Sequence, residues 1–251
     1  MIVMGILNVT PDSFADGGRH NSFDAAVIRG QEMLAQGVDI IDIGGESTKP
    51  GAERVPEAEE LTRVIPVIEA LAKLGARISI DTMRASTAKA AIEAGAQIIN
   101  DVSGGLADPE MLITAAQLNL PYIAMHWRGH SKDMNSRAVY GDVVVDVISE
   151  LQERISAALS AGITKENLII DPGLGFAKES HHNWEIIESI DQFVAMGYPV
   201  LVGGSRKRFL GGDNPDSREA ATIELTKRLA HSGIWGVRVH SVKPHKEVLG
   251  L

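Results

Sequence analysis

The sequence of 251 residues lacks three features that would place it outside the cell or in a membrane. It has no cysteine, which excludes disulfide bonds and thiolate chemistry. No apolar run approaches the roughly 18 residues that a membrane-spanning helix needs. The first residues carry no basic leader and their apolar run ends at Asn8, so a signal peptide is not expected. These absences predict a cytoplasmic protein that does not contact a membrane.

The chain also lacks an excess of positive charge and a recognisable set of metal ligands. Its 24 Lys and Arg residues against 33 Asp and Glu residues give a formal net charge of -9, which argues against general nucleic-acid binding. Any anion must therefore meet a local basic cluster. Several histidines in loops and helices lack the spacing of metal ligands. They are His130, His181, His182 and His231.

What the sequence does contain is a repeated unit of about 30 residues, the size of a strand–helix unit. In each copy a helical pattern ends at a glycine, a short apolar strand follows, and the strand ends in a polar residue. Glycine just past a helix supplies the left-handed residue that ends it. Six glycines fit this pattern: Gly37, Gly75, Gly95, Gly162, Gly197 and Gly233.

The expected strands are short and apolar with little polar alternation, which is typical of a parallel sheet covered on both faces. We expect them at Ile2–Asn8, Val38–Gly44, Arg77–Asp81, Gln97–Asp101, Tyr122–His126, Leu168–Asp171, Val200–Gly203 and Val237–His240. Eight such strand–helix units without a linker predict an α/β fold, a (β/α)8 TIM barrel in a single domain over residues 1–251. An open doubly wound sheet is the alternative. It would be favoured by a glycine-rich dinucleotide turn after the first strand, and Asn8-Val-Thr-Pro-Asp is not such a turn.

Three local signals concern the helices. Pro66 lies within a 3.6-residue apolar pattern and predicts a kink or a restart there. Asp108-Pro109 is typical of an N-cap followed by proline at the first helical position. Asp216 with Glu219 resembles a capping box.

Polar residues gather where the expected strands end, whereas the opposite ends carry mostly Gly, Ala and aliphatic residues. In a parallel barrel all carboxyl ends lie at the same face, where the binding loops are found. This polarity predicts one functional site at that face. The residues at the strand ends are Asn8, Glu46, Asp81, Asn100, Asp101, His126, Asp171, Ser205, Arg206, Lys207, Arg238 and His240.

Two carboxylates and an amide follow the third, fourth and sixth strands. Asp81, Asn100 and Asp171 suit a neutral heterocycle with adjacent hydrogen-bond donors and acceptors. The alternative for each is a structural role that ties loops together, and Asp171 could cap the Pro-Gly turn after it. Three more aspartates are interpreted as structural residues or as barrel and helix contacts: Asp39, Asp42 and Asp101.

Basic residues follow the last two strands, where barrels of this kind often bind phosphate. Arginine offers a fork to phosphate and lysine a point charge. A solvated surface position is the alternative for each arginine, although Arg238 shares one side of the last strand with His240. The basic set is Arg206, Lys207, Arg208, Arg238 and His240, with Lys49 as a further candidate.

Two segments rich in glycine, proline and small polar residues, 10–18 and 47–51, follow the first and second strands. They could close over a bound ligand. The alternative is that they are ordinary long loops between a strand and a helix.

Seven motifs occur in order along nearly the whole chain: Gly5–Phe14, Asp42–Thr48, Ser79–Thr82, Ile99–Asp101, Asp171–Phe176, Ser205–Lys207 and Arg238–His240. Each is weak alone, but together they are highly specific. With them the chain resembles the dihydropteroate synthase family. The resemblance implies a pterin-binding barrel, usually a homodimer, that uses Mg2+ and is the target of sulfonamides. The implied reaction joins 6-hydroxymethyl-7,8-dihydropterin diphosphate to 4-aminobenzoate, giving 7,8-dihydropteroate and pyrophosphate in folate biosynthesis.

The resemblance also implies roles for single residues. Asn8 would meet the Mg2+ on the diphosphate, while Arg238 and His240 would bind the diphosphate itself. The pterin would be held by Asp81, Asn100, Asp171 and Lys207, with Met125 beside it. The 4-aminobenzoate site and its loops would include Phe14, Asp16, Thr48, Lys49, Pro50, Phe176 and Arg208. The catalytic set would be Asp81, Lys207, Arg238 and His240.

The chemistry of the implied reaction agrees with these roles. The reacting carbon is a CH2 group on an electron-rich ring, so the C–O bond can ionise before the amine attacks, an SN1-like path. Positive charge from Mg2+, Arg238 and His240 would stabilise the departing diphosphate. Carboxylates near the pterin would oppose its electron deficiency, and loop closure would exclude water.

The sequence departs from the family pattern at three positions. Lys49 stands where the family usually has Arg, Arg208 stands where some members have Ser, and Ser241 stands where Asp often follows. The change at Lys49 loses a fork-shaped anion contact. Near the aminobenzoate carboxylate, Arg208 could substitute electrostatically for the Ser of other members.

Two other functions remain as alternatives. A pterin-binding methyltransferase acting on a corrinoid partner shares the barrel and the pterin carboxylates, but it has no need of Ser205–Lys207 or of Arg238 with His240. A paralogue that binds pterin without catalysis is the second alternative, and Lys49 is its basis. Phosphate binding discriminates against the first, and aminobenzoate turnover against the second.

Overall fold

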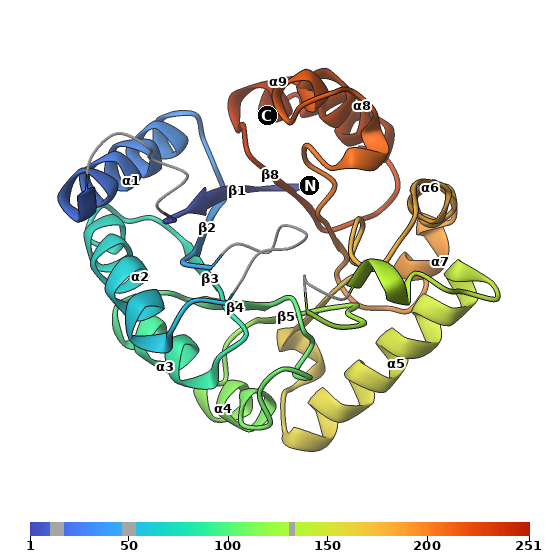
Figure 1. Cartoon of the computed structure of the whole chain (residues 1–251), viewed down its shortest axis with the longest axis horizontal. Coiled ribbons are helices and arrows are strands. Elements are labelled where there is room, and N and C mark those ends of the chain that lie inside the picture. Colours follow the sequence, from blue (N-terminus) through green and yellow to red (C-terminus); the bar gives the residue numbers. More distant parts are fainter. Residues whose placement is uncertain (11–17, 47–53, 131–133) are drawn as a thin grey trace.

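The computed structural model describes residues 1–10, 18–46, 54–130 and 134–251, and within them eight parallel strands form one sheet (Figure 1). The strands are β1 (Ile2–Asn8), β2 (Ile40–Gly44), β3 (Ile78–Asp81), β4 (Ile98–Asp101), β5 (Tyr122–Met125), β6 (Leu168–Asp171), β7 (Leu201–Val202) and β8 (Gly236–Val239). Their order is β6-β5-β4-β3-β2-β1-β8-β7. A parallel bridge between Ile170 of β6 and Val200 joins the two edges, so the strands form a nearly closed barrel. The predicted (β/α)8 barrel is confirmed.

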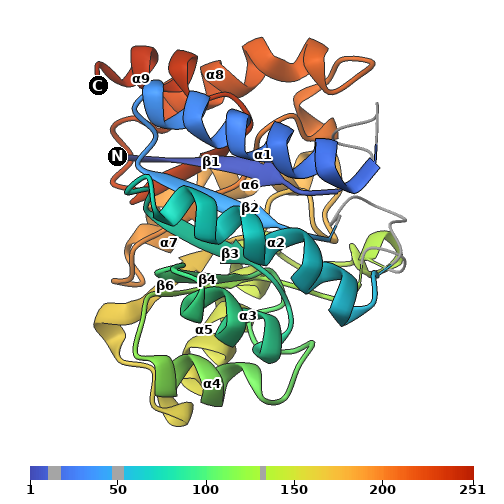
Figure 2. The ribbon, with the colours of Figure 1, turned by 90° about the vertical axis from the view of Figure 1, so that its left-hand side faces the viewer.

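Helices surround the strands on the outside of the barrel (Figures 1 and 2). They are α1 (Gly18–Ala35), α2 (Glu57–Ala72), α3 (Ala85–Glu93), α4 (Met111–Leu118), α5 (Val143–Ala161), α6 (Ser180–Glu188), α7 (Ile190–Val194), α8 (Glu219–Leu229) and α9 (Lys243–Leu249). Short 3-10 turns are η2 (Met134–Arg137), η3 (Lys165–Asn167), η4 (Arg208–Leu210) and η5 (Asp216–Arg218). A search of the described helices finds none with the length and apolarity needed to cross a bilayer.

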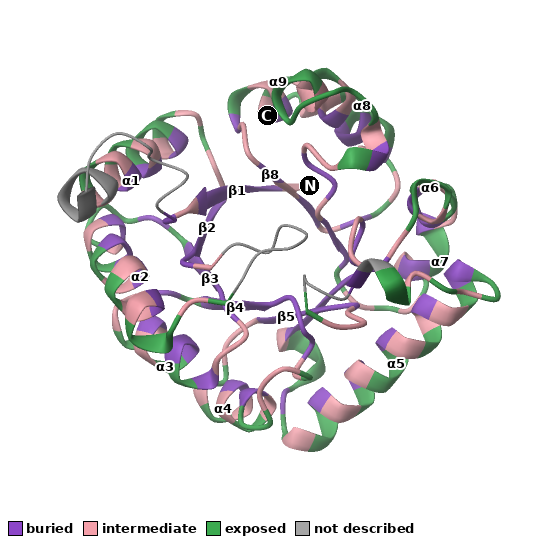
Figure 3. Ribbon diagram, in the orientation of Figure 1, coloured by how far each residue is buried: buried purple, intermediate pink, exposed green. Residues whose placement is uncertain are grey.

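Alternating side chains of the strands pack on two sides of the barrel wall. Outward-facing residues such as Ile41, Ile80 and Ile99 belong to the large core under the helices. A smaller inner cluster fills the barrel interior near the amino ends of the strands. It consists of Met4, Ile40, Ile98, Ile123, Ile169 and Leu201. The strands are accordingly buried, while the helices expose their outer faces (Figure 3).

Two residues further along the strands, the inward positions become polar. Asp42 follows Ile40, Asn100 follows Ile98 and Asp171 follows Ile169, and alternation keeps each pair on one face. Ser79 is in register with Asp42, and Asp81 is in register with Asn100. The apolar inner cluster therefore supports a polar floor at the carboxyl ends of the strands, called the barrel mouth below.

The ends of the helices agree with the sequence at the glycines but only in part at the two predicted caps. The six glycines expected to end helices all have positive φ, between 77° and 116°. Helix α4 begins at Met111, later than predicted, but the Asp108 carboxylate accepts from the backbone N–H of Glu110 at 3.0 Å and also from that of Ala85 at 2.8 Å. The capping box at Asp216 is absent, because α8 has no side-chain cap. Pro66 lies inside α2, which continues through it.

Candidate functional site

Four residues predicted to surround a pterin end neighbouring strands at the barrel mouth. Asp81, Asn100, Met125 and Asp171 lie on β3, β4, β5 and β6, and their exposed fractions are 7%, 3%, 3% and 5%. Asp81 and Asn100 are partners in the β3–β4 register, and Met125 and Asp171 are partners in the β5–β6 register. The structure thus brings this predicted set together.

Arg238 of β8 joins the acidic set directly. Its Nη2 donates to Asp81 Oδ2 at 2.6 Å, and its Nε donates to Asp42 Oδ2 at 2.6 Å. The same Asp42 oxygen accepts from Asn100 Nδ2 at 3.0 Å. The acids of the middle strands and the principal base of the last strand therefore share one mouth of the barrel.

Asp42 was interpreted as a barrel or helix-contact residue, and this interpretation was incomplete. Its side chain is fully buried in the barrel interior, where it binds Arg238 and Asn100 together. Its other oxygen, Oδ1, and the hydroxyl of Ser79 have no partner among the described residues. A carboxylate in the middle of a strand covered on both faces was the signal that could have identified it.

The electrostatics of Asp81 reflect this crowding of acids. Burial raises the pKa of Asp81 to about 7, Arg238 opposes the rise, and the Asp42 carboxylate adds to it. Burial of Arg238 disfavours its charged form, but the carboxylates of Asp42 and Asp81 outweigh that effect and raise its pKa. Arg238 therefore stays charged, and the opposing effects of burial and of Arg238 set the protonation of Asp81.

Asp171 holds the turn that follows it as well as facing the mouth. Its Oδ1 accepts from the backbone N–H of Gly173 at 2.7 Å, which is the capping role considered as an alternative. Burial raises the pKa of Asp171, while this hydrogen bond and the nearby Lys207 oppose the rise. The residue combines a structural contact with a position in the predicted ring site.

Lys207 reaches the same turn from the opposite side. Its Nζ donates to the carbonyl oxygen of Leu174 and lies 4.4 Å from the centroid of the Phe176 ring. Burial lowers the pKa of Lys207 to about 8, and the Asp171 carboxylate limits the fall. The predicted pterin lysine and the predicted aminobenzoate phenylalanine are thus in direct contact.

His240 is not the cation that its place in the basic set suggested. Burial and the charges of Arg206 and Arg238 lower its pKa to about 3, so it is neutral at pH 7. Its Nδ1 lies 2.9 Å from the hydroxyl of Ser205, which also accepts from the His240 backbone N–H at 3.2 Å. With the Ser205 proton directed at Nδ1, the imidazole carries its own proton on Nε2. His240 can then offer an anion a hydrogen bond and no charge.

The other two arginines of the basic set do not contact the acids of the mouth: one is held in ion pairs and the other is exposed to solvent. Arg206, in a left-handed backbone conformation with φ 58°, donates to Glu219 at 2.7 Å and Asp216 at 3.2 Å. These two acids, predicted to form a capping box, are its ion-pair partners instead. Ser241 donates to Glu219, so this departure from the family pattern has a structural partner. Arg208 is exposed at the start of η4.

Asn8 ends β1 at the mouth and is half-buried. An amide oxygen is a hard ligand that suits Mg2+, an ion commonly held by few protein groups together with substrate phosphates. Among the described residues no group of three or more acids and histidines is arranged to hold a metal. Among the described residues, Asn8 is thus the strand-end amide whose chemistry suits an Mg2+ carried on a phosphate ligand.

Five predicted ligand residues lie outside the described part of the chain. They are Phe14, Asp16, Thr48, Lys49 and Pro50. Of the other predicted structural aspartates, Asp101 accepts from the hydroxyl of Tyr122 at 2.7 Å, and Asp39 accepts from Lys246 of α9 at 2.7 Å. Both structural interpretations are confirmed.

Glu46, the acid at the end of β2, is used in an ion-pair group. It accepts from Arg84 at 2.9 Å and from Arg54 at 3.0 Å, and Arg84 also binds the buried Glu60. Glu46 was predictable at the mouth but its partners were not, because Arg54 lies before α2 and Arg84 immediately precedes α3.

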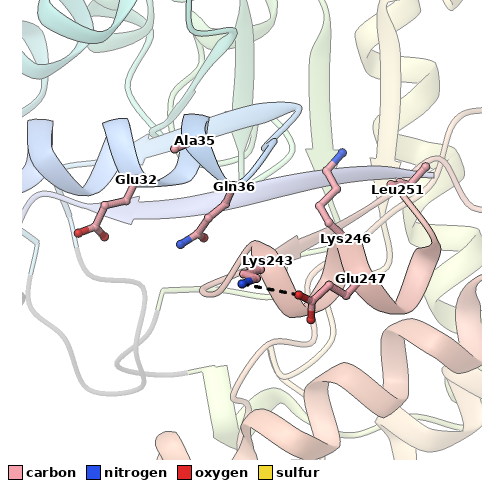
Figure 4. Close-up of a pocket in the computed structure, with 7 residues that line it drawn as sticks. All are labelled: Glu32, Ala35, Gln36, Lys243, Lys246, Glu247 and Leu251. Atoms are coloured by element: carbon pink, nitrogen blue, oxygen red, sulfur yellow. Dashed lines mark ion pairs between the residues drawn. The ribbon is translucent and has the colours of Figure 1, made fainter.

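A surface depression of about 510 Å³ lies away from the mouth, on the outside of the barrel (Figure 4). It is lined by Glu32, Ala35, Gln36, Lys243, Lys246, Glu247 and Leu251. Its walls are the last turn of α1 and the length of α9, in which Lys243 pairs with Glu247 at 3.9 Å. None of the predicted site residues contributes to it.

The chain matches the model of the pterin binding enzyme family over residues 4–240. It therefore belongs to the pterin-binding enzymes. A dihydropteroate synthase of Mycobacterium leprae is 46% identical over 98% of this chain and 90% of the relative. Within the family the chain groups with the dihydropteroate synthases, which are transferases.

Solved structures agree with this assignment. The dihydropteroate synthase of Xanthomonas albilineans with 4-aminobenzoic acid has a TM-score of 0.93 and 44% identity, covering 99% of this chain and 90% of that one. The same enzyme in complex with 7,8-dihydropteroate has a TM-score of 0.90 and 40% identity, covering 99% and 91%. The barrel is thus that of the family.

Proposed function

We propose that the chain condenses 6-hydroxymethyl-7,8-dihydropterin diphosphate with 4-aminobenzoate to give 7,8-dihydropteroate and pyrophosphate. The observation that carries this proposal is the contact of Arg238 with Asp81 and Asp42 at the mouth. One ligand that combines a ring rich in N–H groups with an anion can satisfy both the acids and the base. The ligands of the Xanthomonas albilineans structures, 4-aminobenzoic acid and 7,8-dihydropteroate, support the same substrates.

The pterin ring would lie between the strand-end acids. The edge of the ring would meet hydrogen-bond acceptors and a donor from Asp81, Asn100 and Asp171. All three side chains are almost fully buried, and the low local dielectric strengthens each hydrogen bond. Met125 provides an apolar contact beside the ring. This arrangement fixes the ring and its CH2 group relative to β8.

The diphosphate would lie over β8 and the Ser205–Lys207 segment. Arg238 brings a full charge, and His240 brings a hydrogen bond from its neutral ring. Mg2+ on the diphosphate, with the Asn8 amide oxygen as a protein ligand, would supply further positive charge to the leaving group. These groups stabilise charge that grows as the C–O bond breaks.

The reaction would follow an SN1-like path. The C–O bond of the substrate breaks with its electron pair going to the diphosphate, and the arylamine nitrogen then forms the C–N bond and loses one proton. Phe176 forms one wall for the arylamine beside Lys207, whose ammonium lies on the same ring. No nucleophilic side chain is required. We further propose that the enzyme acts in the cytoplasm as a homodimer and that sulfonamides compete with 4-aminobenzoate.

Pyrophosphate release tests this function. We expect release only when pterin diphosphate, 4-aminobenzoate and Mg2+ are present together. Asp81→Ala should weaken pterin binding in calorimetry by roughly 30- to 100-fold, because it removes a buried hydrogen-bonding carboxylate worth about 2–3 kcal/mol. The matched control Asp213→Ala, at an exposed position, should bind as the wild type does.

The alternatives give different results in the same assays. A corrinoid methyltransferase would bind the pterin without preferring its diphosphate. A catalytically inactive paralogue would bind pterin diphosphate in calorimetry but release no pyrophosphate when 4-aminobenzoate is added. Either outcome from folded protein would contradict the proposed reaction.

A further inference from the structure

We propose that Lys178 is a positioning residue, which holds the turn of residues 172–177 so that Leu174 and Phe176 keep Lys207 in place. This segment is called the β6 turn below. The proposal rests on the proposed function, because it concerns the placement of Lys207 for that reaction. Lys178 is outside every set of residues that the sequence motifs point to, and its hydrogen bonds go to the β6 turn and to His126.

The ammonium of Lys178 makes three hydrogen bonds, one for each of its N–H groups. It donates to the carbonyl oxygens of Gly173 at 3.1 Å and Phe176 at 3.2 Å, both in the β6 turn. The third bond goes to His126 Nδ1 at 2.8 Å. Lys178 thus links both ends of the turn to the end of β5.

His126, the third partner of Lys178, is itself held in place by burial and by hydrogen bonds. It is 1% exposed, and its backbone N–H donates to the Asp171 carbonyl at 2.9 Å. Because Nδ1 accepts from Lys178, the ring proton lies on Nε2, which donates to Glu150 Oε2 of α5 at 2.9 Å. Arg128 holds the same carboxylate, with its Nε 3.0 Å from Oε2. Burial lowers the pKa of His126 to about 4, so this neutral tautomer persists over the ordinary pH range.

Lys207 meets the other side of the same turn. Its Nζ donates to the Leu174 carbonyl and lies over the Phe176 ring, so three carbonyls of the turn accept from two lysines. The packing is close. A Cβ atom at Gly175 would lie 2.7 Å from Lys207 Cδ, and one at Gly173 would lie 2.5 Å from the His126 carbonyl oxygen. A shift of the turn would therefore change both contacts that Lys207 makes with it, to the Leu174 carbonyl and to the Phe176 ring.

A buried lysine would be an unfavourable choice at this position if it only packed against its neighbours. Burial lowers its pKa well below the usual value, which means that the charged form is held at a cost. Methionine would fill a similar volume without that cost. What methionine cannot do is donate to the carbonyls of Gly173 and Phe176, and this difference separates positioning from packing.

The test uses the full chain with Lys178→Met, Lys207→Met and the double variant. We expect Lys178→Met to lower kcat by about 10- to 100-fold, because displacement of a contact group by about 1 Å has effects of that order. If Lys178 acts through Lys207, the double variant should lose no more activity than Lys207→Met alone. Lys165→Met, at an exposed position by the other end of β6, is the control and should be unchanged.

Amide hydrogen exchange provides a readout that does not depend on turnover. Residues 172–178 should exchange faster in Lys178→Met than in wild type or Lys165→Met, while β1 and β2 keep their rates. Lys178→Gln, which retains two N–H groups, should restore part of the protection and of kcat. These results together support the positioning role.

Several outcomes would overturn it. They are a kcat within twofold of wild type, losses that multiply in the double variant, or exchange that rises throughout the molecule. Failure of both Lys178→Met and Lys178→Gln to fold would make the residue structural. A folded wild type that binds its substrates but has no turnover would instead refute the proposed function, and the exchange data would still decide whether Lys178 holds the turn.

Discussion

At the scale of single residues, Lys207 links the site to the pH dependence of stability. Its pKa is lowered to about 8 in the folded protein, against about 10.4 in an unfolded chain. Between these values the unfolded chain holds a proton that the folded chain has released, so stability increases as pH rises. Relative to Lys207→Met, the wild-type free energy of unfolding should increase by about 2–3 kcal/mol across this window.

Urea unfolding at intervals from pH 7 to pH 10 measures this difference. Lys165→Met, at an exposed position, is the matched control. Parallel stability curves for wild type and Lys207→Met would show that the ammonium of Lys207 is not held at a cost.

Individual residues also show what the sequence could and could not predict. Asp81, Asn100 and Asp171 were predictable because each ends an apolar strand, and the parallel topology carries all such ends to one face. The neutral state of His240 was not, because it depends on burial and on Arg206 and Arg238 from other parts of the chain.

At the scale of elements, Asp142 is the clearest helix cap in the described chain. Its Oδ1 accepts from the backbone N–H groups of Val144 and Val145, each at 3.0 Å, at the start of the longest helix, α5. Asp142→Ala should lower the free energy of unfolding by about 1 kcal/mol. Chemical denaturation checks this, with the exposed Asp213→Ala as the control, and equal losses in both variants would contradict the capping role.

The elements were predicted best where one residue decides the conformation by itself. Gly95 and Gly162 end helices because a left-handed backbone suits glycine, and no distant partner is involved. The prediction of a capping box at Asp216 and Glu219 was wrong because both carboxylates bind Arg206. This pairing across the fold is more favourable than the local capping contacts. A local motif competes with partners that the local sequence does not contain.

At the scale of the whole molecule, the described strands share the fewest paired residues where β6 meets β7. Five residue pairs join β1 to β2, but β7 has two residues, and its junction with β6 is a bridge at Ile170 and Val200. The Ile170 amide, bonded to Pro199 at 2.9 Å, should therefore have a lower opening free energy than the Ile41 amide, bonded to Arg77 at 2.9 Å.

Native-state hydrogen exchange followed by NMR checks this expectation. Both amides belong to fully buried residues, so a difference of about 1–2 kcal/mol would report the junction and not simple exposure. Equal opening free energies would show that the barrel unfolds as one unit. The number of strands was predictable from the repeat, whereas this weak junction depends on how the short β7 meets its neighbour.

The placement of Arg238 has a consequence for selectivity. With Asp42 and Asp81 both bound to its guanidinium, an isolated phosphate gains little by approaching, since it has to compete with two buried carboxylates for the same charge. A ring that occupies Asp81 releases part of that charge toward the anion attached to the same ring. We infer that binding of the ring and binding of the anion are favourably coupled when both belong to one ligand. The protein would then discriminate against free inorganic phosphate through this coupling and not through the shape of the site.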